Sequence, residues 1–105
     1  MIENRIRSLL DAPEAGDGAP TLAHIEDLLT AGYAHAMALE GEQWRLQRRI
    51  VDVALALAEG YKEPDARELR ELAGELREVE SELTGIRALI RSLRARASEA
   101  RANAA

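Results

Sequence analysis

The sequence predicts an all-α fold: an antiparallel, coiled-coil-like hairpin of two long helices with a short helix before it, paired with a second copy into a four-helix bundle. Three observations predict this. Ala, Leu, Glu, Arg and Lys make up 63 of the 105 residues, as is typical of long helices. Apolar residues recur at alternating spacings of three and four over two long segments, which is a heptad pattern. Cys and Phe are absent, which disfavours a disulfide scaffold or a β-sandwich.

The first two segments, 1–11 and 12–20, are predicted to be a short helix and a loop. Apolar residues at positions 2, 6, 9 and 10 share one helical face. A helix this short is marginal alone in water, so we expect it to dock on the rest of the chain. The loop holds two of the three prolines and two glycines, and Thr21 follows as the expected N-cap of the next helix.

Two long helices are predicted over 21–58 and 65–101, joined by a tip at 59–64. The heptad seam of the first runs from Leu22 to Leu57, and that of the second runs without a miss from Leu69 to Ala100. Gly60 suits the left-handed position that ends a helix. Residues 102–105 are expected to fray. The length is expected to hold one domain.

A short connection between helices of similar length predicts an antiparallel hairpin. This register places Gly32 opposite Ile90. It also brings the acid-rich segment 63–82 to Arg45, Arg48 and Arg49, and the Arg-rich segment 87–101 to Glu26, Asp27 and Glu40. Each surface pair contributes only ~0–1 kcal/mol. Acidic residues at the start of the last helix and basic residues at its end also complement the helix dipole. The charge distribution can therefore reflect either pairing across the hairpin or the dipole alone.

A second apolar stripe on helix 21–58 predicts self-association. One partner helix cannot cover both faces, and the helix at 1–11, about 16 Å long, is too short to cover the stripe. We therefore predict a homodimer with Trp44 near its interface. The alternative is that Trp44 lies flat on the surface beneath Arg48. The stripe consists of Tyr33, Met37, Trp44, Val51 and Leu55.

No pattern of side chains predicts catalysis, a metal site or a cofactor. The two histidines, His24 and His35, lie about 16 Å apart along one helix, which is too far for one metal ion. Phosphate-binding, dinucleotide-binding and metalloprotease motifs are absent from the sequence. We therefore predict a protein that is not an enzyme and that acts as a protein–protein interaction or scaffold module. Its expected partners are a second copy and another protein.

Two other functions remain open. The chain could regulate a larger machine by inserting its acidic hairpin tip, formed by Glu59, Tyr61, Lys62 and Glu63. It could also bind anionic surfaces weakly, either nucleic acid or membrane, through a stripe of arginines. The stripe consists of Arg87, Arg91, Arg94 and Arg101.

Charge and hydropathy predict the compartment. The formal net charge of −5 disfavours nucleic acid as a partner. The longest uncharged stretch, 28–39, is too short and too polar for a transmembrane helix. The first residues do not have the pattern of a signal peptide. We therefore expect a cytoplasmic protein.

Overall fold

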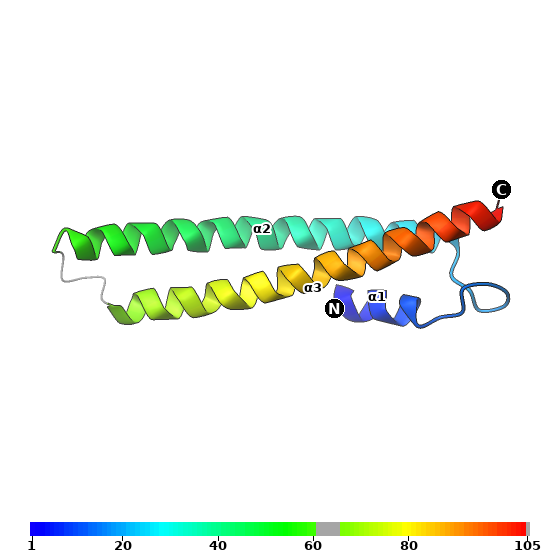
Figure 1. The fold of residues 1–105 in the computed structure, drawn as a ribbon, viewed down its shortest axis with the longest axis horizontal. Helices are drawn as coiled ribbons and strands as arrows, with labels where there is room; N and C mark the ends of the chain where they lie inside the picture. Colours follow the sequence, from blue (N-terminus) through cyan, green and yellow to red (C-terminus); the bar gives the residue numbers. More distant parts are fainter. Residues whose placement is uncertain (61–65, 105) are drawn as a thin grey trace. The chain divides into compact units, whose positions relative to one another are not determined.

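The computed structural model describes residues 1–60 and 66–104. Within these ranges the chain forms three helices and no strand: α1 (Ile2–Leu10), α2 (Leu22–Ala58) and α3 (Ala66–Ala104) (Figure 1). The two long helices α2 and α3 pack against each other, so the predictions of an all-α fold and of two packed long helices are confirmed. Contacts gather into two units, Met1–Met37 with Thr84–Ala105 (unit 1) and Ala38–Leu83 (unit 2).

The ends of the helices follow local chemistry. The Thr21 hydroxyl oxygen accepts a hydrogen bond from the backbone N–H of His24 at 3.1 Å, which is the predicted N-cap of α2. Gly60 has φ +86° and its N–H donates to the carbonyl of Leu57 at 3.1 Å, as expected for the residue after a helix. α2 continues through Gly41.

The α3 helix extends to Ala104, three residues beyond the end predicted at residue 101. Ala102 and Ala104 continue the last turn, because alanine is the strongest helix former. The predicted start of this helix at residue 65 lies outside the described residues.

Unit 1 contains three packed segments: α1, the start of α2 and the end of α3. Ile6 of α1 is fully buried, and Leu9 is 4% exposed. The segments approach closely at Gly32, where a Cβ atom would lie 3.3 Å from Ile90 Cγ1 and 3.5 Å from Ile6 Cδ1. The predicted pairing of Gly32 with Ile90 is therefore confirmed. The buried hydrophobic residues of this unit are Ile6, Leu9, Ile25, Leu28, Leu29, Ala36, Ile86, Ile90, Leu93 and Ala97.

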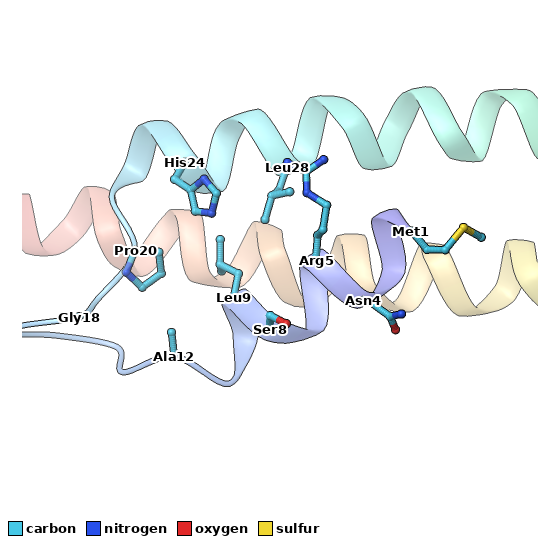
Figure 2. A pocket seen from close by; sticks show the side chains of 10 residues that line it. All are labelled: Met1, Asn4, Arg5, Ser8, Leu9, Ala12, Gly18, Pro20, His24 and Leu28. Carbon is cyan, nitrogen blue, oxygen red and sulfur yellow. The ribbon is translucent and has the colours of Figure 1, made fainter.

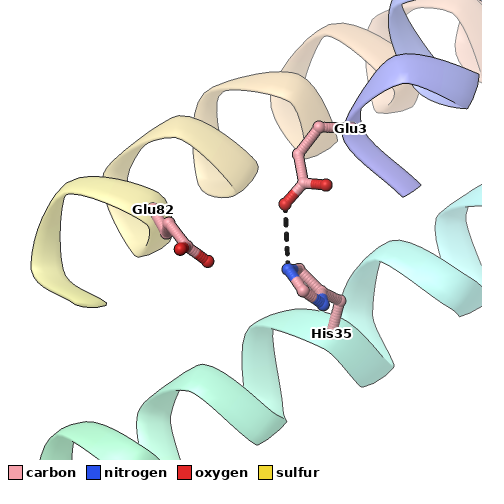
Figure 3. Close-up of side chains that lie close together, drawn as sticks. All are labelled: Glu3, His35 and Glu82. Carbon is pink, nitrogen blue, oxygen red and sulfur yellow. Dashed lines mark ion pairs between the residues drawn. The ribbon is translucent and has the colours of Figure 1, made fainter. Parts of the chain in front are cut away.

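Polar contacts hold both ends of α1. At its start, Glu3 Oε1 lies 2.9 Å from His35 Nε2 of α2, an ion pair when the imidazole is protonated (Figure 3). At its end, the Arg96 guanidinium of α3 donates to the carbonyls of Leu10 at 3.1 Å, Ala12 at 3.3 Å and Pro13 at 3.1 Å. The Leu10 carbonyl is one that the end of a helix leaves without an intrahelical partner, and the Ala12 and Pro13 carbonyls belong to the loop that follows α1.

Unit 2 contains the end of α2 and the start of α3. Its buried hydrophobic residues, among those described, are Leu39, Leu46, Val53, Val79 and Leu83. Other seam residues are only half-buried: Ile50, Leu57, Leu69, Leu72 and Leu76. An ion pair between Arg49 Nη2 and Glu68 Oε1 at 2.6 Å joins the two helices. This contact confirms the predicted approach of the acidic segment to α2 at Arg49, whereas the predicted approach to Arg45 and Arg48 stays a prediction.

None of the described helices combines the length and the apolarity that crossing a bilayer requires.

Candidate interaction surface

All five residues of the predicted apolar stripe are exposed. In unit 1, Tyr33 is 44% exposed and Met37 70%. In unit 2, Trp44 is 60% exposed, Val51 53% and Leu55 56%. Apart from Met1, no other large hydrophobic side chain of the described residues is exposed. The expectation that the hairpin leaves this stripe uncovered is therefore confirmed, whereas its role as an interface stays a prediction.

The exposed residues of unit 2 lie on the side of α2 that faces away from α3. Trp44 is two residues from the buried Leu46, which places the two side chains about 160° apart around the helix. Val51 follows Trp44 by seven residues, and Leu55 follows Val51 by four, so the three side chains share one face. α3 covers the opposite face and cannot reach them.

Trp44 is in contact with a cation within its own helix. The guanidinium carbon of Arg48 lies 5.7 Å from the centroid of the Trp44 ring, a cation–π contact worth roughly 0.5–1 kcal/mol at an exposed site. This contact is the one expected from the alternative prediction, in which Trp44 lies flat on the surface beneath Arg48. The contact does not cover the ring, because the residue stays 60% exposed.

The predicted tip can be followed only as far as Gly60. Glu59 is exposed and its backbone N–H donates to the carbonyl of Leu55 at 3.0 Å. Tyr61, Lys62 and Glu63 lie outside the described residues. The tip as a regulatory element therefore stays a prediction.

The arginine stripe of α3 is partly engaged within the chain. Arg101 Nη2 lies 3.3 Å from Glu26 Oε1 of α2, as the antiparallel register predicts, and Arg87 is also engaged. Arg94 and Arg101 line a recess of about 300 Å³ together with Tyr33 and Ser98, and Arg91 is exposed. Internal pairing therefore accounts for part of the stripe, and its contact with external anions stays a prediction.

Sequence reasoning missed the polar contacts of unit 1. Arg96 does not belong to the predicted stripe, and its carbonyl partners lie 83 to 86 residues away along the chain. The partners Glu3 and His35 are also on different helices. No local spacing indicates such contacts, because they depend on where α1 docks.

Comparison with protein-family models, with curated proteins and with solved structures finds no match to this chain. Its function is therefore inferred from the surface chemistry described above.

Proposed function

We propose that the chain is a non-enzymatic protein interaction module that self-associates through the exposed apolar face of α2. The observation that carries this proposal is that unit 2 leaves one apolar face of α2 exposed. Two helices bury five described hydrophobic residues there, while Trp44, Val51 and Leu55 remain 53–60% exposed. Covering apolar surface stabilises an assembly by about 25 cal/mol for each Å² removed from water.

A second copy of the chain fits this face. Met37, Trp44 and Val51 recur every seven residues along α2, the period at which one helix presents a continuous seam to another. A two-fold symmetric pair brings the same face of each copy together, so one set of side chains supplies both sides of the interface. A bundle of four helices is the assembly that this pairing favours.

A lipid surface fits this face less well than a protein does. Anionic headgroups repel a chain with a net charge of −5. Self-association instead covers the apolar side chains and leaves the charged faces of both copies in water. Those faces are then present twice in the assembly, which suits a scaffold that binds another protein.

Sedimentation equilibrium of two matched variants tests this proposal. Val51→Arg and Ala38→Arg each add one positive charge at an exposed position of α2 in unit 2. Ala38 is six residues from Trp44, or about 120° away from it around the helix. We expect the wild type and Ala38→Arg to sediment as dimers. Val51→Arg is expected to sediment near the chain mass of 11.5 kDa, because it places a charge without a partner in the apolar interface.

Circular dichroism of the same samples checks that both variants keep their helices. A wild-type chain that sediments at 11.5 kDa throughout the micromolar to millimolar range would contradict self-association. A Val51→Arg variant that dimerises as tightly as Ala38→Arg would assign the interface to another surface.

A further inference from the structure

Unit 1 contains a hollow that the proposed self-association does not use. Its volume is about 510 Å³, and it lies among α1, the loop after α1 and the first turns of α2 (Figure 2). This volume falls within the roughly 300–1,000 Å³ range of small-molecule sites. The lining residues are Met1, Asn4, Arg5, Ser8, Leu9, Ala12, Gly18, Pro20, His24 and Leu28.

One part of the lining is apolar and firmly placed. Leu9 of α1 is 4% exposed and Leu28 of α2 is 1% exposed, so both belong to the core of unit 1. Ala12 and Pro20, at either end of the loop, add further apolar surface. A hydrocarbon group in the hollow would contact mainly Ala12 and Pro20, above a floor formed by the packed Leu9 and Leu28.

The polar part of the lining contains one cation, the Arg5 guanidinium, together with His24, Asn4 and Ser8. Figure 2 shows the Arg5 side chain extending from α1 toward α2, and the His24 ring extending from α2 toward α1. Neither side chain makes a hydrogen bond or an ion pair with another described residue. No carboxylate is among the ten lining residues, although the chain carries 19 acidic residues. The hollow therefore lacks an anion to match its arginine.

We propose that this hollow binds a small aliphatic carboxylate. Its carboxylate group accepts hydrogen bonds from the Arg5 guanidinium and from His24, and its hydrocarbon chain lies on Leu9 and Leu28. A guanidinium presents parallel N–H donors that match a carboxylate, and the apolar side of the lining contacts the hydrocarbon part of the ligand. The proposal does not depend on self-association, because every lining residue belongs to unit 1.

Titration with decanoate, followed by amide NMR shifts of the full chain, tests the proposal. We expect saturable shifts that concentrate in residues 4–12 and 20–28. Arg5→Gln is expected to weaken decanoate binding by about tenfold or more, because a hydrogen bond to a charged group is lost. Arg70→Gln, an exposed position in unit 2, removes the same charge and is expected to leave the affinity unchanged.

Decanol separates recognition of the charge from general apolar binding. We expect decanol, which has the same hydrocarbon chain without the carboxylate, to bind more weakly than decanoate. Equal affinity for the two ligands would overturn the proposal, as would unchanged decanoate affinity in Arg5→Gln. Shifts confined to residues 44–55 would overturn it as well, because decanoate would then bind the exposed apolar face of α2.

Discussion

Gly32 shows how a single residue determines the packing of unit 1. It is buried in α2, and the space that a side chain would fill is occupied by Ile90 of α3 and Ile6 of α1. Glycine within a helix costs about 1 kcal/mol relative to alanine. At Gly32 this cost is offset because the missing side chain lets α1, α2 and α3 approach one another closely. Gly85, also within a helix of unit 1, has nothing within 4 Å of the corresponding Cβ position.

The substitution Gly32→Leu is therefore expected to destabilise the chain, and Gly85→Leu to leave it equally stable or stabilise it. A leucine at position 32 overpacks the core, at a cost of about 1–3 kcal/mol. A leucine at position 85 meets open space and improves helix propensity by up to about 1 kcal/mol. Urea unfolding followed by circular dichroism measures both changes. Transition midpoints that move in the same direction by the same amount would contradict the close packing at Gly32.

At the scale of elements, α1 depends on α3 for its position. α1 has only nine residues and is too short to be stable alone. Ile6 and Leu9 supply its apolar contacts, and Arg96 binds the carbonyl of its last residue, Leu10, and two carbonyls of the loop that follows. The bonds of Arg96 to Leu10 and Ala12 are partly buried, so these two are shielded from water more than those of a surface arginine.

Loss of the Arg96 guanidinium is expected to loosen α1 selectively. In Arg96→Gln, we expect the amides of residues 6–11 to exchange about tenfold faster or more, because the local opening free energy falls. Arg91→Gln removes an exposed arginine from the same helix and serves as the control. Hydrogen exchange measured by NMR gives the rates. Equal exchange of residues 6–11 in both variants would show that Arg96 does not hold α1.

Local patterns in the sequence predict the long helices well. For α1 they predict that it docks on the rest of the chain, but not where it docks. The heptad seams, the Thr21 cap and the turn of the backbone at Gly60 each depend on neighbouring residues. The pairs Arg49–Glu68 and Arg101–Glu26 follow from the antiparallel register. The bonds of Arg96 and the pair Glu3–His35 depend on tertiary placement, and no periodicity specifies that placement.

At the scale of the whole molecule, buried apolar residues are shared unevenly between the two units. Among the described residues, unit 1 buries ten hydrophobic residues and unit 2 buries five. The extra helix of unit 1 accounts for part of this difference. The stripe on α2 could be predicted from its seven-residue repeat, whereas the hollow beside α1 could not, because it forms only when α1 and its loop dock.

Trp44 reports directly on self-association through unit 2. Trp44 is the single tryptophan of the chain, and it is 60% exposed in one copy. A dilution series of the wild-type protein, followed by the wavelength of maximum tryptophan emission, measures how far water reaches this ring. We expect the emission to move to shorter wavelengths as the concentration rises, because a second copy covers Trp44. Emission that stays at the wavelength of a solvent-exposed tryptophan at every concentration would contradict self-association through this face.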